Sequence, residues 1–439
     1  MNSPELTGPL CLTPFERYMM MDERSGYPMT FPLVWRVSGG IDRAEFEAAF
    51  QEALSWHPLL RGCVGDEGWI LDRPAETHVS FVASDQRFDC ESSVDCHVGP
   101  MVRCRVVGNG LEQEVQFVFH HMATDGVCGA EFCGDVFCLY AKKKGGLVRP
   151  LHRPVPEGLP DRAMLDRAVS KPVSRWTAAK FVTKETLRFL SRRSESVRPE
   201  NGFVRNDAAW QMADCLIDRE QTQRVIEAAD GLNATLNDWA MVALMRSVGR
   251  WNDQQNGSRS NGWIVANMPV HMRPRGARRR SACNAIGYSF LARRRRAVDD
   301  WLPAVKNLAK ETKAIQEWKM AGMFVDAVAL TLRCPGAMRL ATSRLLRPAS
   351  FVMSCIGDPS RRFRTRLPAD GNGNPVAGNL TILGMLGAAP CRPGTELTAS
   401  VVTLGGKLSL SVRLTPRLFS IEACQQMVEI WKDEILREI

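Results

Sequence analysis

The pattern of apolar and polar positions in the first third of the chain predicts helices that alternate with strands. Apolar residues recur at helical spacing over positions 46–54, directly after Asp42, so Asp42 is the predicted N-cap of an amphipathic helix. Thr13 and Glu16 have the spacing of a capping box, which together with the intervening proline predicts an earlier helix over 14–21. One short helix therefore opens the chain, and a second helix packs an apolar stripe against a core.

Short runs rich in β-branched and aromatic residues predict strands around these helices. The predicted strands cover residues 32–37, 60–64, 69–71, 79–82, 101–107 and 114–121. The last strand ends at His120 and His121, and the chain must then turn, because a helix is predicted to begin near Val127. Gly126 stands at that turn and permits backbone angles that larger residues resist. The sequence thus places a loop at the end of a strand and directly before a helix.

The second half of the chain shows the same mixture of elements. Thr235 and Asp238 form another capping-box pattern, which predicts a helix that continues to about Trp251. The other predicted elements are strands over 262–270 and 285–291, a hairpin of 397–404 with 407–414, and a helix capped by Ser420. Strands and helices mix in both halves, which indicates an α/β protein with two lobes.

A proline-rich segment separates the predicted lobes. Four prolines fall between residues 147 and 160, which favours an exposed connection. We predict a first lobe over residues 1–150, a connection over 151–205 and a second lobe over 206–439. The connection includes a basic helix over about 163–194, which we interpret as a solvated crossover rather than a helix that binds nucleic acid or a membrane surface.

Composition supports an ordinary globular protein. The chain has 439 residues, of which 45% are hydrophobic and 24% are charged, so it has ample material for a buried core. No basic leader with a long apolar stretch opens it, and no apolar run reaches the roughly 18 residues of a membrane span. These features predict a soluble protein of the cytoplasm without a membrane span.

The cysteines are interpreted as reduced thiols. There are 14 of them and none forms a CxxC pair. Cys128, Cys133 and Cys138 are five residues apart on a predicted helix, so successive thiols are rotated by about 140° and cannot face one metal ion. Core packing is therefore predicted for them, and no metal site.

The formal net charge of +9 favours an acidic partner. Between residues 271 and 296 the chain carries arginines and no carboxylate, at positions 273, 275, 278, 279, 280, 293, 294, 295 and 296. One interpretation of this excess is a solvated face, and another is a docking surface for the phosphates of coenzyme A or for an acidic carrier protein. In the docking interpretation, the residues predicted to dock the donor are Arg293, Arg294, Arg295 and Arg296. Nucleic-acid binding is not expected, because only Tyr288 and Phe290 supply aromatic rings nearby.

The end of the strand at 114–121 carries the most informative residues. Side chains alternate along a strand, so Phe117, Phe119 and His121 share one face while Val118 and His120 share the other. Because the two histidines point apart, they are not expected to bind one metal ion together. One ring is free to face a cavity while the other ring anchors the strand.

The segment from His120 to Gly126 matches the pattern HHxxxDG at all four defined positions. It resembles the superfamily of condensation domains and chloramphenicol-acetyltransferase-like acyltransferases. Other segments that resemble this superfamily follow in the expected order, at 12–17, 57–61, 267–273, 284–287 and 354–358. The resemblance covers nearly the whole chain, and it implies two lobes, each a mixed sheet with packed helices, that form a V around a central tunnel. The DFGWG motif of the plant acyltransferases is absent from the sequence, which disfavours that subgroup.

The resemblance also implies roles for individual residues. His121 would be the general base, which takes the proton from the acceptor as it attacks a thioester, without an acyl-enzyme. His120 would support the strand, and Asp125 would hold the loop by pairing with an arginine, for which Arg273 is the best match. Arg273 could also be one of many surface arginines.

Two groups are candidate donors to the developing oxyanion. The resemblance implies a backbone N–H or a hydroxyl near the centre of the tunnel, and Gly126 N–H and Ser354 fit this description. Cys355 stands where many relatives carry asparagine, which weakens the assignment of Ser354.

The expected function is therefore acyl transfer from coenzyme A or an acyl carrier protein to a small alcohol or amine. No tightly bound cofactor and no metal are expected, nor is an oligomer. Two alternatives stay open: a non-catalytic or carrier-binding domain of the same fold, and a basic nucleic-acid-binding protein, which would bind in a salt-sensitive way.

Overall fold

The structure is a computed structural model of the whole chain. It describes residues 10–73, 75–83, 94–163, 165–166, 194–202, 211–256, 261–273, 279–343 and 347–439. Most of the predicted basic helix at 163–194 lies outside the described residues, as do the arginines at 275 and 278. No helix in the part of the chain that the structure describes is long and apolar enough to cross a bilayer.

The first lobe is built on a six-stranded sheet of order β11-β12-β1-β6-β5-β4. Its strands are β1 (Thr30–Ser38), β4 (Val79–Val82), β5 (Val102–Val107), β6 (Glu112–His120), β11 (Val376–Ala377) and β12 (Leu380–Gly387). Strand β6 lies inside the sheet, antiparallel to both β1 and β5. A small hairpin of β2 (Cys63–Gly65) and β3 (Gly68–Ile70) stands apart from this sheet.

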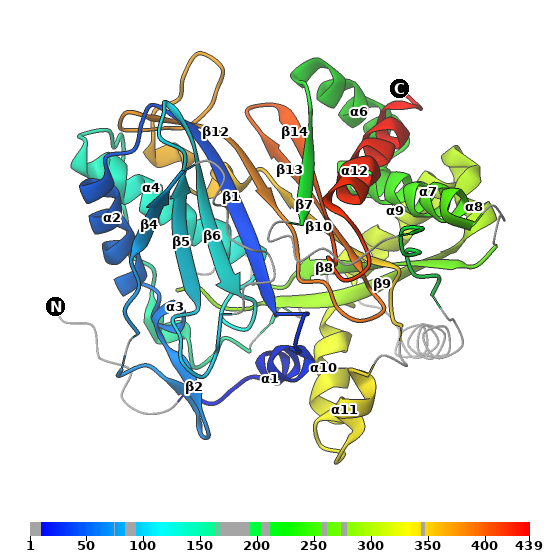
Figure 1. Cartoon of the computed structure of the whole chain (residues 1–439), viewed down its shortest axis with the longest axis horizontal. Coiled ribbons are helices and arrows are strands. Elements are labelled where there is room, and N and C mark those ends of the chain that lie inside the picture. Colours follow the sequence, from blue (N-terminus) through cyan, green and yellow to red (C-terminus); the bar gives the residue numbers. More distant parts are fainter. Residues whose placement is uncertain are drawn as a thin grey trace.

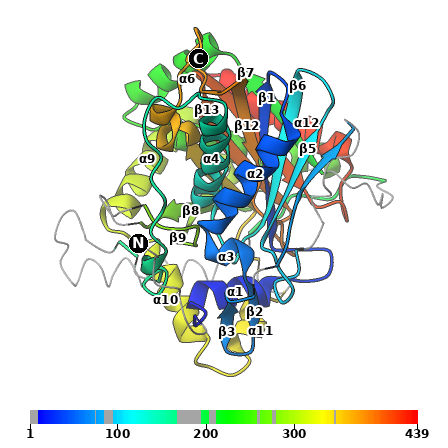
Figure 2. The same cartoon turned by 90° about the vertical axis from the view of Figure 1, so that its left-hand side faces the viewer.

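Among the described residues, the helices of this lobe are α1 (Pro14–Asp22), α2 (Arg43–Ser55), α3 (Pro58–Arg61) and α4 (Gly126–Lys143). Helices α2 and α4 run side by side across one face of the sheet (Figure 2). Thr13 and Glu16 form the predicted capping box of α1, and the Asp42 side chain accepts from the backbone N–H of Glu45 at the start of α2. Local capping chemistry thus fixes where the helices of this lobe begin.

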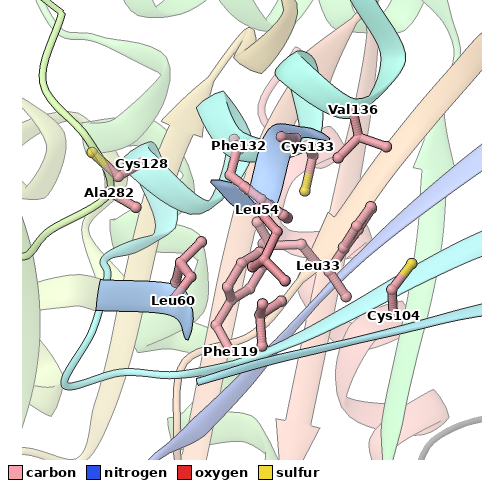
Figure 3. Close-up of a cluster of buried hydrophobic side chains, with 14 of the residues drawn as sticks. Leu33, Leu54, Leu60, Cys104, Phe119, Cys128, Phe132, Cys133, Val136 and Ala282 are labelled. Atoms are coloured by element: carbon pink, nitrogen blue, oxygen red, sulfur yellow. The ribbon is translucent and has the colours of Figure 1, made fainter. Parts of the chain in front are cut away.

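Helix α4 packs an apolar side against the first sheet (Figure 3). Phe132 and Cys133 of α4 meet Leu54 of α2 and Phe119 of β6 in this core. The three cysteines at 128, 133 and 138 are all buried, so their thiols belong to the packing of the lobe.

The second lobe has a six-stranded sheet of order β7-β14-β13-β10-β8-β9. Its strands are β7 (Met212–Ile217), β8 (Trp263–His271), β9 (Ile286–Arg294), β10 (Phe351–Gly357), β13 (Leu397–Leu404) and β14 (Lys407–Leu414). The helices of this half are α6 (Arg219–Gly231), α7 (Leu236–Asn256), α8 (Arg295–Asp299), α9 (Trp301–Glu317), α10 (Gly322–Thr331), α11 (Ala337–Ala341) and α12 (Ile421–Leu436). Short 3-10 turns lie at η1 (Pro156–Gly158), η2 (Pro359–Arg362) and η3 (Arg364–Arg366). The sheets stand side by side with helices on their outer sides, so the predicted two-lobed α/β fold is confirmed (Figure 1).

The lobes are not separate segments of sequence. Strands β11 and β12 come from the second half of the chain, yet β12 pairs antiparallel with β1 and completes the first sheet. Leu380 and Ile382 of β12 are fully buried in the core of the first lobe. The predicted boundaries of 1–150 and 206–439 therefore do not divide the two sheets, because the pairing of strands so distant in sequence leaves no local signal.

The second sheet has one apolar face and one polar face. Alternate residues of β14, such as Leu410 and Val412, pack in the helix-side core. The residues between them point toward the first lobe, and similar polar residues follow in β8 and β13. This inner set is buried and consists of Asn267, Thr398, Ser400, Ser409, Ser411 and Arg413. The lobes thus meet across a buried polar surface.

Several inner polar groups bond directly to the first lobe or to the segment that follows β12. The Ser400 hydroxyl donates to the carbonyl of Gly387 at 2.5 Å, and Arg413 donates to the carbonyl of Thr30 at 3.1 Å. The orientation of the lobes is therefore held by specific hydrogen bonds.

One predicted element is wrong in part. Residues 60–64 were expected to form a strand, but Leu60 lies in helix α3 and the strand β2 begins only at Cys63. Pro58 explains the difference, because a proline fits the first turn of a helix and starts α3.

Candidate active site

His121 lies just beyond the end of β6, where the strand turns toward α4. Its backbone N–H donates to the carbonyl of Met29 at 2.6 Å, and its ring meets the Phe31 ring with centroids 5.0 Å apart. The ring is 7% exposed. The strand pair of β1 and β6 therefore fixes both the backbone and the ring plane of His121.

The tautomer of His121 follows from its one side-chain hydrogen bond. Nδ1 lies 3.1 Å from the carbonyl oxygen of Thr124, and because a carbonyl only accepts, Nδ1 must carry the proton. The lone pair is then on Nε2, for which no described residue is a hydrogen-bond partner. Burial lowers the pKa of His121 below its ordinary value, and this effect exceeds the opposite effect of Asp125. The ring is thus held neutral with a free basic nitrogen.

His120 has different partners. Its Nδ1 accepts from the backbone N–H of Met122 at 3.2 Å, so its Nε2 carries the proton and donates to Glu23 at 3.1 Å. The ring is fully buried. Both nitrogens are occupied, and His120 joins β6 to the end of α1.

Asp125 holds the loop through both of its oxygens. Oδ1 accepts from the N–H groups of Val127 and Cys128 and so caps α4, while Oδ2 accepts from Ala285 N–H at 2.9 Å and from Arg273 at 2.7 Å. Burial alone would raise the pKa of Asp125, but the Arg273 guanidinium and the N–H donors lower it below its ordinary value. The carboxylate is charged and fully engaged within the chain, with no capacity left for a substrate.

Arg273 comes from the second lobe and reaches the start of α4. One nitrogen, Nη2, donates to Asp125, to the thiol sulfur of Cys128 at 2.9 Å and to the carbonyl of Cys283 at 2.7 Å. Its side chain is 12% exposed. The ion pair of Asp125 and Arg273 therefore joins the two lobes directly beside His121.

The segment 279–285 of the second half, which we term the clasp, lies against the first lobe. Asn284 donates through its amide to the carbonyls of both His121 and Met122. Ser281 donates to the carbonyl of Trp56 at 2.7 Å. The clasp thus bonds to the backbone of the loop from His121 to Asp125 between β6 and α4, which we term the histidine loop. Sequence reasoning missed this role for Asn284. The only sequence signal for Asn284 is that it lies in one of the weaker family-like segments. Its contact with His121 spans 163 positions, so the sequence does not indicate it.

A second contact of the clasp reaches the middle of α4. Arg279 pairs with Asp135, and the same carboxylate accepts from His57 Nε2 at 3.0 Å. The other His57 nitrogen accepts from the N–H of Ala282 at 2.8 Å. Arg279 is therefore an interlobe structural residue rather than part of a free basic surface.

The two candidate oxyanion donors, Gly126 N–H and the Ser354 hydroxyl, come from α4 and β10. Gly126 is the first residue of α4, and a Cβ added to it would lie 3.6 Å from Ile356 of β10. Ser354 is two residues before Ile356 in β10, and it is paired with Ser400 of β13 before the register shifts between Cys355 and Gly357. Ser354 is partly buried. The structure thus places Gly126 where α4 meets β10, and Ser354 on β10 itself.

The arginine run at 293–296 is largely engaged within the chain. Arg293 pairs with Glu311 at 2.8 Å, and Arg295 pairs with Asp253. Arg294 and Arg296 are exposed. Arg294 ends β9, nine residues after the clasp, so at about 3.3 Å per residue it lies roughly 30 Å along the strand from Ala285. This geometry favours the solvated-face interpretation of the run.

One group of described side chains has metal-binding residue types: Glu23, Cys96 and His120. A metal at His120 Nε2 would need the proton on Nδ1, but Nδ1 accepts from the Met122 N–H. The present hydrogen bonds therefore suit a protonated Nε2 paired with Glu23, and they do not suit an ion.

Comparisons with known proteins agree with this architecture. No family model matches the sequence. Two uncharacterized proteins of Mycobacterium tuberculosis, from strains CDC 1551 / Oshkosh and ATCC 25618 / H37Rv, are each 24% identical over 98% of this chain and 100% of their own length.

Solved structures are similar over almost the whole chain. The nonribosomal peptide synthetase FmoA3 matches with a TM-score of 0.65 and 17% identity over 100% of this chain, which spans only 45% of FmoA3. The EpoB cyclization-docking bidomain of Sorangium cellulosum matches with a TM-score of 0.64 and 11% identity, over 98% of this chain and 84% of that one. The starter condensation domain of rhizomide synthetase RzmA, in complex with C8-CoA and Leu-SNAC, matches with a TM-score of 0.61 and 12% identity, over 97% of this chain and 93% of that one. This chain has the condensation-domain fold. Within that fold, the histidine loop lies where the first lobe meets the clasp of the second.

Proposed function

We propose that this chain is an acyltransferase that moves an acyl group from a thioester of coenzyme A or of an acyl carrier protein to an alcohol or amine. The observation that carries the proposal is the state of His121. Its Nδ1 proton is held by the carbonyl of Thr124, and its Nε2 lone pair has no described partner. A buried neutral imidazole with one free basic nitrogen is suited to general-base catalysis.

The proposed reaction needs no covalent enzyme intermediate. Nε2 of His121 takes the proton of the acceptor O–H or N–H while the acceptor forms a bond to the thioester carbon. The electron pair of the carbonyl moves to its oxygen, where Gly126 N–H and the Ser354 hydroxyl are the proposed donors. The product of this addition is a tetrahedral intermediate that is not bound covalently to the enzyme. When its carbonyl re-forms, the thiolate leaves and receives the proton from His121.

The structural neighbours support a thioester donor. The RzmA starter condensation domain was captured with C8-CoA, a thioester carrier, and with Leu-SNAC. The intact Asp125–Arg273 pair supports a catalytic rather than a purely scaffolding domain, because it braces the loop that carries the base. The acyl group and the acceptor are left to experiment.

The test is turnover with panels of acyl-CoAs and acyl carrier proteins, each mixed with alcohols and amines and followed by mass spectrometry. His121→Ala should reduce the turnover rate by a factor of about 10² to 10⁴, and its melting temperature should equal that of the wild type. His121→Asn serves as a second variant of similar volume, and His78→Ala, at an exposed histidine, is the matched control. More than about a tenth of wild-type turnover in both His121 variants rejects the base assignment. Binding of a carrier without turnover in the wild type would instead favour the non-catalytic alternative.

A further inference from the structure

The β8–β9 pair turns one row of side chains toward the first lobe. Ala266 and Met268 of β8 pack in the helix-side core, so Asn267 between them points the other way. Tyr288 of β9 also faces the first lobe, because its ring meets Phe15 of α1 with centroids 5.5 Å apart. Asn267 and Tyr288 therefore share the inner face of this strand pair.

Tyr288 has a partly buried ring and a hydroxyl that no described residue binds. Its ring also packs against Phe324 of α10, with centroids 4.9 Å apart, but its hydroxyl has no hydrogen-bond partner among the described residues. Burial raises the pKa of Tyr288 well above its ordinary value, and Tyr18 and Asp22 add to the effect. The hydroxyl therefore stays protonated, which makes it a hydrogen-bond donor.

Asn267 supplies the complementary group. The residue is 8% exposed, and its Oδ1 is buried without a hydrogen-bond partner in the described structure. Buried polar atoms in native proteins are nearly always paired, so an unpaired acceptor calls for an explanation. On the same face, one unpaired acceptor thus lies near one unpaired donor.

The spacing of the two groups follows from the strand register. Asn267 is opposite Phe290 and Tyr288 is opposite Pro269, so Asn267 and Tyr288 are diagonal neighbours whose backbone positions lie about 7–8 Å apart. Strand β9 begins directly after Ala285, whose N–H is bonded to Asp125. The pair therefore lies close to the histidine loop, on the second-lobe side.

We propose that Asn267 and Tyr288 bind an amide group of the pantetheine arm of the thioester donor. The amide N–H donates to Asn267 Oδ1, and the Tyr288 hydroxyl donates to the amide C=O. An amide fits because it offers a donor and an acceptor on opposite sides and has no charge. A carboxylate would bring no donor to Asn267, and a hydrocarbon acyl chain would satisfy neither group. This inference rests on the proposed function and names how that site recognises its donor.

The test compares two donors that carry the same acyl group, one as the pantetheine thioester and one as the thioester of 1-propanethiol, which has no amide. We expect the wild type to prefer the pantetheine donor in kcat/KM. Tyr288→Phe and Asn267→Leu should each reduce that preference about fivefold, the size of one lost hydrogen bond. Both variants should keep or raise the melting temperature, because neither removes a bond within the chain. Free pantetheine should raise the melting temperature of the wild type and not of the variants, which reports binding without turnover.

The matched control is Thr398→Val on the same inner face. Its hydroxyl donates to the carbonyl of Ala389 at 2.8 Å, so this variant should lose stability and keep the wild-type preference. If the wild type turns over and both variants keep its preference for the pantetheine donor, the inference about Asn267 and Tyr288 is wrong. The proposed chemistry of His121 is not affected by that result. Absence of turnover with every thioester rejects the proposed function. If pantetheine then also fails to shift the wild-type melting temperature, the amide site is rejected independently.

Discussion

Nε2 is the basic nitrogen of His121 because the other ring nitrogen, Nδ1, donates to a backbone carbonyl. The Thr124 carbonyl fixes the proton on Nδ1, and the buried surroundings disfavour a second proton. The strand alternation in the sequence predicts that the two histidines turn apart, and their separate partners reflect this. The partners themselves could not be predicted, because Glu23 and Asn284 are 97 and 163 positions from the histidines they contact.

The proposed role of His121 as a general base predicts a pH dependence of turnover. Because burial lowers the pKa of His121 from 6.5, the ring remains neutral at a pH where an exposed histidine would be protonated. We expect kcat/KM to fall only as the pH drops through this lowered pKa, so the midpoint of the acid limb should lie below 6.5. An alcohol acceptor is used for the measurement, since its hydroxyl does not titrate there. A midpoint above 6.5 contradicts the assignment.

The Asp125–Arg273 pair should behave as one unit in stability. Asp125→Asn keeps an acceptor for the α4 cap and removes the charge, and Arg273→Ala leaves the carboxylate buried without its partner. Each single change should cost about 3–5 kcal/mol, and the double variant should be little worse than either. Unfolding in urea measures the cycle. Costs that add to within about 0.5 kcal/mol would show that the two residues act independently.

At the scale of elements, local signals were sufficient for caps and hairpins. The hairpin of β13 and β14 matches its predicted ranges, and the predicted capping residues Thr13, Asp42 and Ser420 all cap their helices. The clasp had no such signal. Its bonds to α4 and to the histidine loop are long-range, so the sequence of this segment indicates only an arginine-rich stretch and a weak family-like motif.

The clasp yields a prediction with an internal control. Asn284→Ala leaves the carbonyls of His121 and Met122 buried without this donor, at a cost of about 1–3 kcal/mol for each. We expect kcat to fall with stability, because the loop that carries the base loses its brace. Ser281→Ala removes a clasp bond to Trp56, away from the loop, and should lose stability with kcat unchanged. Equal kcat values in the two variants would remove Asn284 from the positioning of His121.

At the scale of the whole molecule, the two lobes should unfold together. Strand β12 crosses from the second half of the chain into the first sheet, and inner hydroxyls of the second sheet bond to residues beside it. We expect a single calorimetric transition in which the measured and van't Hoff enthalpies agree. Leu380→Ala should lower the melting temperature of that one transition, by the roughly 2–5 kcal/mol of a large-to-small core change. Two transitions, with only one shifted, would show that the lobes are independent.

The late position of β12 in the sequence also determines when the first sheet can be completed during synthesis. Strand β6 ends at His120 and β12 ends at Gly387, 267 residues later. At about 5–20 residues per second, the ribosome needs roughly 13–53 s to supply that stretch. During this interval the nascent first sheet has β1 as an open edge, with Leu33 and Trp35 among its residues. An unpaired apolar edge is a site where a growing chain can pair wrongly with other chains, and this edge stays open until β12 has been synthesised.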